Sequence, residues 1–238
     1  RSDIFIFMGD NVYGDDKITG KLNKLIKAYK KQKTKIPFSK LRETNEIHAI
    51  WDDHDYGKND GGAEYQYKED SKNLFLDFWG ISLNDPRRNR DGIYFETKKL
   101  TQKGTLQIIF LDTRYFRSPL KRTDERGAPG KERYLPDNSH DKTFLGEEQW
   151  DWLSNKLDED ADIRIIVSSI QIIAEGHGFE KWGNLPREKR KLYELIDKKN
   201  IKDMIFLSGD RHAGGIYNEI TDTGIRLYEI TSSCLNLP

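Results

Sequence analysis

Three separate segments of the chain place acidic side chains or a histidine directly after a run of apolar residues. They are IFIFMGDNVYGDD (residues 4–16), IHAIWDDHDYGKND (residues 47–60) and DMIFLSGDRHAGG (residues 203–215). Each apolar run predicts a buried strand, and the carboxyl ends of parallel strands meet at one edge of an α/β sheet. Two carboxylates about 4 Å apart repel by roughly 4 kcal/mol at an effective dielectric constant of ~20. Acidic groups gathered in this way therefore predict a bound cation.

The first segment offers an aspartate and a tyrosine to the same place. Gly9 lets the chain turn sharply after the strand and leaves Asp10 at the sheet edge. Tyr13, three residues further on, can point to the same position. A carboxylate can bridge two cations, and a phenolate is a hard ligand that suits ferric iron better than zinc. The alternative is a structural Gly-Asp turn with Tyr13 in the core.

The second segment is the most acidic of the three. Six of the nine residues from 52 to 60 carry a carboxylate, amide or imidazole ligand group, Asp53 and His54 among them. An EF-hand loop that started at Asp53 would need Asp or Asn at its fifth position, where this chain has Gly57. A solvated acidic turn is the other alternative. Because the segment directly follows an apolar strand, we favour a binding site.

The third segment holds Asp210 and His212 in one tight turn, followed by two glycines that let a ligand or another backbone approach closely. A histidine alone is more often structural, but its place beside an aspartate at a strand end makes a ligand role equally plausible. We therefore take both side chains as candidate metal ligands.

Two further segments add candidates of other kinds. Residues 110–117 end a strand with Asp112 and bring in Arg114, and an arginine suits bidentate contact with a phosphate. A structural Asp–Arg pair fits Arg114 equally well. Residues 168–171 end another strand at Gln171, whose amide is either a ligand for a hard cation or a plain hydrogen-bonding group.

The remaining pattern alternates strands with amphipathic helices and predicts an α/β fold. We expect strands over residues 4–8, 48–51, 92–97, 106–111, 164–168, 204–208, 215–220 and 225–231. Helices are expected over residues 18–33, 63–79, 146–157 and 187–199, with Pro37 helping to close the first and Gly80 ending the second. Residues 118–141 form a long loop. No internal repeat or low-complexity linker is visible, so we predict one domain over residues 1–238.

Composition excludes several classes of protein. Forty basic and forty acidic residues balance. The chain therefore lacks the excess positive charge that would indicate a nucleic acid or an anionic membrane as partner. Cys234, the single cysteine, excludes an internal disulfide framework and a cysteine-rich zinc site. No apolar run reaches the ~18 residues of a membrane span, and no signal peptide is visible. The chain opens with Arg-Ser-Asp and enters a strand at once, which suggests a fragment or processed form.

The ordered motifs resemble the PhoD-like alkaline phosphatases, a branch of the calcineurin-like metallophosphoesterases, over essentially the whole chain. The resemblance is carried by GDNVYGDD, IWDDHDYGKNDGGAEY, FLDTRYFR, SSIQ…EGHGFEKWGNLPREK and FLSGDRHAGG. It implies a four-layer α/β/β/α sandwich, here without its N-terminal strand or strands. It also implies a site with Fe³⁺ and Ca²⁺ rather than zinc.

Matched position by position, the resemblance implies that Asp10 bridges the metals and that Tyr13 binds iron. Asp53 and His54 fall on the superfamily's Gly-Asn-His motif. Asp210 and His212 fall on the ligands of its Gly-His-x-His motif, and the aspartate makes that site richer in oxygen, as calcium prefers. An upstream strand of the family supplies another ligand, typically a cysteine, and Cys234 lies in the wrong motif to replace it.

The expected function is metal-dependent hydrolysis of small phosphate esters by a metal-bound hydroxide, with His54 as a hydrogen-bond or proton donor and Arg114 at the phosphate. The resemblance also implies a secreted, periplasmic or cell-surface bacterial protein. One alternative is a phosphodiesterase that acts on phospholipids or nucleic-acid ends, without a stable nucleic-acid complex. Another is a calcium-binding module without catalysis. The oligomeric state is left open.

Overall fold

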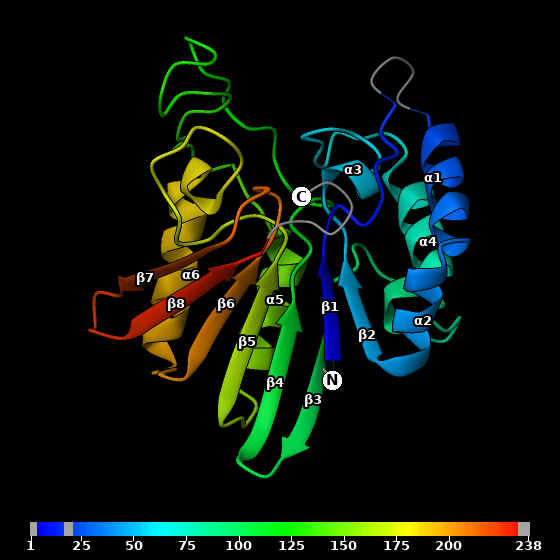
Figure 1. Ribbon diagram of the computed structural model, residues 1–238. Helices are drawn as coiled ribbons and strands as arrows, with labels where there is room; N and C mark the ends of the chain where they lie inside the picture. Colours follow the sequence, from blue (N-terminus) through cyan, green and yellow to red (C-terminus); the bar gives the residue numbers. More distant parts are fainter. Residues whose placement is uncertain (1–3, 17–20, 233–238) are drawn as a thin grey trace.

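Two β-sheets form the centre of the computed structural model, which describes residues 4–16 and 21–232 (Figure 1). In the first sheet, β1 (Ile4–Met8) pairs in parallel with β2 (Glu46–Ile50). The second has the order β3-β4-β5-β6-β8-β7. Its strands are β3 (Phe95–Thr101), β4 (Gly104–Phe110), β5 (Ile163–Ser168), β6 (Met204–Ser208), β7 (Gly215–Ile220) and β8 (Arg226–Thr231). The four inner strands are parallel, whereas β3 and β7 are antiparallel edges.

Helices cover the outer face of each sheet. The α-helices are α1 (Asn23–Lys33), α2 (Ile36–Thr44), α3 (Asp53–Tyr56), α4 (Lys68–Trp79), α5 (Gly146–Leu157) and α6 (Pro186–Lys198). Two short 3₁₀ turns, η1 (Pro86–Arg88) and η2 (Trp182–Asn184), complete the set in the described ranges. Helices α1, α2 and α4 lie over the small sheet, and α5 and α6 lie over the large one (Figure 1). The expected four-layer α/β/β/α sandwich is therefore confirmed.

Two apolar clusters hold the layers together, and the middle strands contribute to both. On β5, Ile166 packs in the cluster that contains Leu153 of α5 and Leu192 of α6. The next residue, Val167, packs in the cluster that contains Ile50 of β2 and Phe75 of α4. Successive side chains of a strand point to opposite faces, so a strand between two layers must be apolar on both. The continuous Ile and Val runs of the sequence have this cause.

Most expected elements are confirmed, but Pro37 was assigned to the wrong role. It lies in the first turn of the separate helix α2 rather than closing α1. Proline fits this position because the first turn does not use its missing N–H. Helix α1 begins at Asn23, and residues 17–20 lie outside the described ranges. Cys234 also lies outside them.

The acidic segment after β2 is also more ordered than a loop. Asp52 is the N-cap of the one-turn helix α3, in a reciprocal capping box with Asp55. Helix α4 begins at Lys68, later than expected, and ends as predicted at Gly80, a left-handed C-cap. The long segment 118–141 contains no helix or strand apart from an isolated bridge between Arg122 and Tyr134. No described helix is long and apolar enough to cross a membrane.

Gly9 fixes the distance between the ends of β1 and β2. Its φ is +101°, and a Cβ at this position would lie 2.5 Å from Cβ of Asp52. We expect Gly9→Ala to lower the free energy of unfolding by about 2–4 kcal/mol, since it adds a steric clash to the cost of the left-handed backbone. Gly130→Ala is the control, because its φ is +74° but no described atom lies within 4 Å of the added Cβ. Urea unfolding of both variants measures the difference, and equal losses would contradict the close approach.

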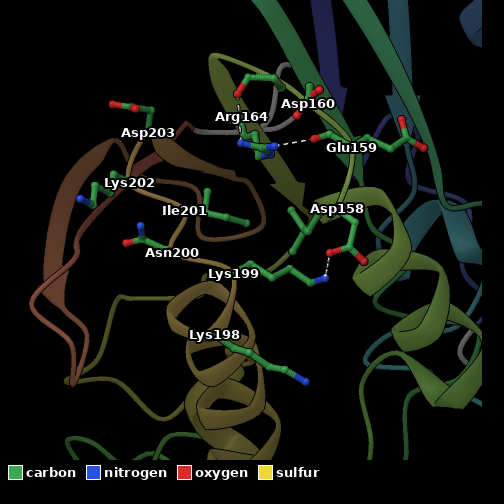
Figure 2. A pocket seen from close by; sticks show the side chains of 12 residues that line it. Asp158, Glu159, Asp160, Arg164, Lys198, Lys199, Asn200, Ile201, Lys202 and Asp203 are labelled. Carbon is green, nitrogen blue, oxygen red and sulfur yellow. Dashed lines mark hydrogen bonds and ion pairs between the residues drawn. The ribbon is translucent and has the colours of Figure 1, made fainter.

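A cavity of about 600 Å³ lies at the edge of the large sheet opposite to the carboxyl ends of its strands (Figure 2). It is lined by the segments that lead into β5 and β6, including residues 157–161 and 198–203. Two of its basic side chains contact other parts of the lining. Lys199 contacts Asp158, and Arg164 donates to the backbone oxygen of Glu159. This cavity is therefore a feature of helix-to-strand packing, and the acidic groups must be sought at the other edge.

Candidate metal centre

The carboxyl ends of β1, β2 and β6 bring the acidic residues of the three segments together. Oxygens of Asp10 and Asp53 and a ring nitrogen of His54 all lie within 4.8 Å of one another. Oxygens of Asp10, Asp52 and Asp210 form a second such group. Asp10 belongs to both groups, as expected for a residue that bridges two cations. The predicted convergence of the three segments is thus observed, although the ligand roles stay predictions.

Asp55 links the carboxyl ends of β1 and β2 through hydrogen bonds. It is fully buried, and its carboxylate accepts hydrogen bonds from the backbone N–H groups of Asp10 (3.2 Å) and Asp52 (2.6 Å). Asn11 adds a second link, because its side-chain amide donates to the backbone oxygen of Ile50 at 2.8 Å. The backbone of Asp10 has a φ of 51°, a conformation that these contacts hold in place. The sequence placed Asp55 in an acidic segment but did not indicate this role.

Tyr13 connects the first segment to the third. Its hydroxyl donates to Oδ2 of Asp10 at 3.0 Å and lies 3.0 Å from Nε2 of His212. The phenol oxygen, the imidazole and the carboxylate therefore meet at one point. The alternative that Tyr13 belongs to the apolar core is not supported by this geometry.

His54 lies beside the carboxylates with its ring fixed on two sides. Its Nδ1 is 2.5 Å from Oδ1 of Asp15, its Nε2 is 3.9 Å from Oδ1 of Asp53, and its ring centroid lies 4.3 Å from that of Tyr13. Burial lowers the pKa of His54, but the hydrogen bond to Asp15 and the charge of Asp53 outweigh it and raise the pKa to about 9. The imidazole is thus held with a proton close to the acidic group.

Burial and mutual repulsion oppose ionisation of the clustered carboxyl groups. Burial, together with the charges of Asp53 and Asp52, raises the pKa of Asp10 to about 11. Burial and the charge of Asp52 also raise the pKa of Asp210 well above its ordinary value. A cation would reverse this effect because it favours the charged form.

The buried oxygens provide the test of whether cations fit. Oδ2 of Asp52 and Oδ1 of Asp53 are buried and accept no hydrogen bond from any residue in the described ranges. Buried polar atoms are normally satisfied, so unsatisfied carboxylate oxygens within these groups call for a cation. Carboxylate, phenol and imidazole donors suit hard or intermediate metal ions. The residues present therefore fit a metal centre.

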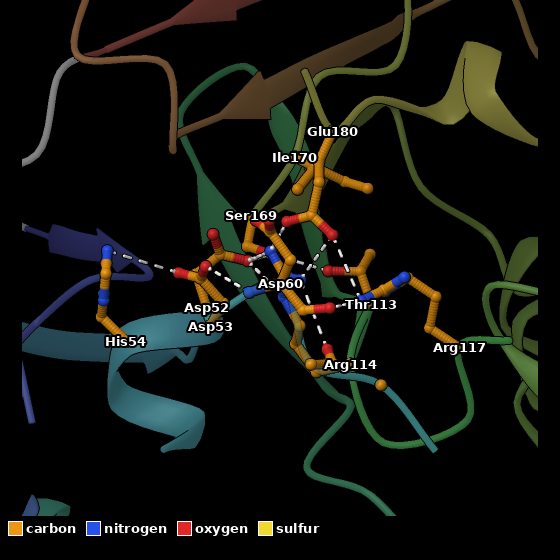
Figure 3. Close-up of polar contacts among 12 residues, drawn as sticks. Asp52, Asp53, His54, Asp60, Thr113, Arg114, Arg117, Ser169, Ile170 and Glu180 are labelled. Carbon is orange, nitrogen blue, oxygen red and sulfur yellow. Dashed lines mark hydrogen bonds and ion pairs between the residues drawn. The ribbon is translucent and has the colours of Figure 1, made fainter. Parts of the chain in front are cut away.

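Arg114 does not take the role expected of it at the phosphate. Its guanidinium is fully buried, with Nε donating to Asp52 at 2.8 Å and the two terminal nitrogens donating to Glu180 at 2.9 and 2.6 Å (Figure 3). The structural-pair alternative is the one that this geometry supports. The partners of the guanidinium are Asp52 and Glu180, whereas Asp112 accepts a hydrogen bond from the backbone N–H of Arg114 and not from its side chain.

Gln171 also uses its amide within the protein. Its nitrogen donates to the hydroxyl of Thr231 at 2.9 Å, and its oxygen lies 3.0 Å from Nε2 of His177. These contacts favour the hydrogen-bonding alternative over the ligand role that we predicted for it.

Sequence reasoning missed two acidic residues behind the centre. Oxygens of Asp60 and Glu180 lie with an oxygen of Asp53 within 4.8 Å of one another. The backbone N–H of Asp60 donates to Oδ2 of Asp53 at 2.8 Å, which orients that carboxylate. Asp60 belongs to the acidic segment noted above. Glu180 follows its strand by a dozen residues, so nothing in the sequence placed it here.

Comparison with known proteins identifies the family of this chain. A family model described as PhoD-like phosphatase matches residues 1–236. The chain belongs to this family. Alkaline phosphatase D of Bacillus subtilis (strain 168) is 28% identical over 132 residues, which are 52% of this chain and 21% of that protein.

The solved structure of PhoD has the same fold. It matches with a TM-score of 0.76 at 16% identity, over 98% of this chain and 51% of that one. At this identity, the likeness shows the fold alone. The chain spans about half the length of the solved PhoD structure and about a fifth of the curated relative.

Proposed function

We propose that this chain hydrolyses phosphate esters at a centre of bound cations. The ligands would be Asp10, Tyr13, Asp53, Asp210 and His212. The convergence of three strand ends on carboxylate oxygens within 4.8 Å of one another carries this proposal. Membership in the PhoD-like phosphatase family supports the reaction class.

We also propose Fe³⁺ and Ca²⁺ as the cations, as the family resemblance implies. The phenol oxygen of Tyr13, 3.0 Å from both Asp10 and His212, is a hard donor suited to ferric iron. The carboxylates of Asp53 and Asp210 suit calcium, which prefers oxygen ligands. When bound, such cations lower the pKa of a nucleophilic water and offset the negative charge of the phosphate.

His54 is the proposed hydrogen-bond or proton donor to the leaving group. Asp15 holds its Nδ1 and Tyr13 packs against its ring, so that Nε2 is the nitrogen that faces the acidic group. A donor whose orientation is fixed in advance stabilises charge that develops in the transition state. Asp55 and Asp60 would keep the ligand-bearing strand ends in place.

Removal of the metals by chelation tests the proposal. Chelation should lower turnover of p-nitrophenyl phosphate at least about 100-fold, and reloading with Fe³⁺ and Ca²⁺ should restore it. Calcium at 100 times its Kd should stabilise the protein by about 2.7 kcal/mol, a rise in Tm of roughly 5–11 °C at this size. Metal analysis of the purified protein identifies the ions.

Two other outcomes would contradict the proposal, and a third would narrow it to one class of ester. Stabilisation by calcium without hydrolysis of any ester indicates an inactive calcium-binding module. Turnover of bis(p-nitrophenyl) phosphate alone indicates a phosphodiesterase. Turnover that survives chelation excludes a metal centre.

A location outside the cytoplasm remains an expectation from the resemblance, which fractionation of the source cells can test.

A further inference from the structure

Two arginines lie over one aromatic ring at the margin of the metal centre. Cζ of Arg211 is 4.1 Å from the ring centroid of Phe179, and Cζ of Arg133 is 5.7 Å from it. The three side chains come from separate segments, and all are partly exposed. Arg211 lies in sequence between Asp210 and His212, both proposed ligands. The ring therefore holds positive charge next to the place where a phosphate would bind.

The two guanidinium groups differ in what they contact. Nη1 of Arg133 donates to both carboxylate oxygens of Asp60, at 3.0 and 2.9 Å. The side chain of Arg211 makes no hydrogen bond or ion pair with any residue of 4–16 or 21–232. A guanidinium carries five N–H donors in a planar fork. In Arg211, this fork is held by Phe179 and open to a ligand.

The positive charge of Arg211 lowers the pKa of a neighbouring histidine. Burial and the nearby guanidinium of Arg211 lower the pKa of His177 to about 4. With Arg133 and Lys181 nearby, Arg211 adds to a group of cations beside the acidic residues of the centre. This arrangement favours an anion that arrives from solvent.

We propose that Arg211 binds the phosphate group of the substrate and gives the site its preference for monoesters, with Phe179 as the positioning residue. The inference rests on the proposed function. A monoester has one more non-bridging oxygen than a diester and can carry one more negative charge. A planar guanidinium binds two oxygens of one phosphate in a fixed fork geometry that a lysine ammonium lacks. Because a monoester carries the greater negative charge, removing this cation affects monoesters more than diesters.

The main test is the Arg211→Gln variant of the metal-loaded protein. We expect kcat/KM for p-nitrophenyl phosphate to fall about 10- to 100-fold, and that for bis(p-nitrophenyl) phosphate to fall less than about 5-fold. Arg211→Lys should recover little. The matched control is Arg126→Gln, which removes an exposed arginine of segment 118–141 and should change neither value.

The positioning role of Phe179 has its own variants. Phe179→Leu keeps an apolar side chain but removes the aromatic face, so the monoester preference should fall about 3- to 5-fold. Phe179→Tyr keeps the ring face and should restore the preference. A loss in both variants would contradict positioning by the ring.

A binding measurement separates this inference from the proposed function. Calorimetry with inorganic phosphate should give a Kd about 10- to 100-fold weaker for Arg211→Gln than for the unmodified protein. Equal losses on both esters, or an unchanged phosphate Kd, would overturn the inference. If the unmodified protein hydrolyses neither ester, the proposed function fails, and the phosphate Kd still decides whether Arg211 binds the anion.

Discussion

Asp10→Asn is expected to lower kcat/KM for a phosphate ester by about 10²- to 10³-fold and to make the metal-free protein more stable. Asp10 belongs to the group with Asp53 and His54 and also to the group with Asp52 and Asp210. Its loss therefore weakens both proposed cation sites. Metal ions stabilise transition-state charge by several kcal/mol, and each 1.36 kcal/mol is a factor of ten in rate. Without metal, burial and the neighbouring acidic groups raise the pKa of Asp10 to about 11, so folding at neutral pH has to protonate this carboxyl group, and Asp10→Asn removes that cost.

Steady-state kinetics and thermal unfolding, each with and without metals, measure both effects of Asp10→Asn. The control is Asp151→Asn, which neutralises an exposed carboxylate on α5 and should leave rate and Tm unchanged. An opposite change of activity and stability is typical of a functional residue. If Asp10→Asn instead destabilises the metal-free protein and leaves turnover intact, Asp10 is structural and the proposed centre is wrong.

The sequence predicted the convergence of those acidic residues that lie at strand ends. Asp10, Asp53 and Asp210 each follow an apolar run that folds as a strand, and the shared direction of β1, β2 and β6 then forces them to one edge. This inference needs only the period of the strands and the topology of an α/β sheet. His212 follows from Asp210 because the two share a turn.

Residues that support the centre from behind could not be predicted in the same way. Glu180 lies in the long connection after β5, and its contact with Arg114 depends on how that connection folds back. The burial of Arg114, which favours a structural ion pair over contact with phosphate, could not be predicted for the same reason, since sequence gives the type of side chain but not its burial. Pro37 shows the limit for helices. A proline closes one helix or opens the next, and only tertiary packing decides between them.

Arg114→Met is expected to lower the free energy of unfolding by about 3–5 kcal/mol, which corresponds to a fall in Tm of roughly 6–20 °C at this size. The guanidinium pairs with Asp52 and Glu180, and all three side chains are at most 3% exposed. Its removal leaves Asp52 without this cation and leaves Glu180 with Arg117, at 3.2 Å, so the desolvation cost of the two buried carboxylates is less fully offset. Thermal unfolding of the metal-free variant measures the loss.

A double variant distinguishes a lost ion pair from a lost apolar contact. The double variant Arg114→Met, Glu180→Gln should lose about 1–3 kcal/mol less unfolding free energy than the sum of the two single losses. The reason is that Glu180→Gln removes a buried charge that has lost one of its partners. Arg226→Met is the control, since the side chain of this exposed arginine on β8 donates a hydrogen bond to Asn218, and its loss should cost less than about 0.5 kcal/mol. Strict additivity of the two buried changes would indicate that Arg114 binds the substrate and does not form a stabilising ion pair. A normal Tm for Arg114→Met with a large rise in KM would indicate the same. In that case the buried pair would not be what holds Asp52 beside Asp10.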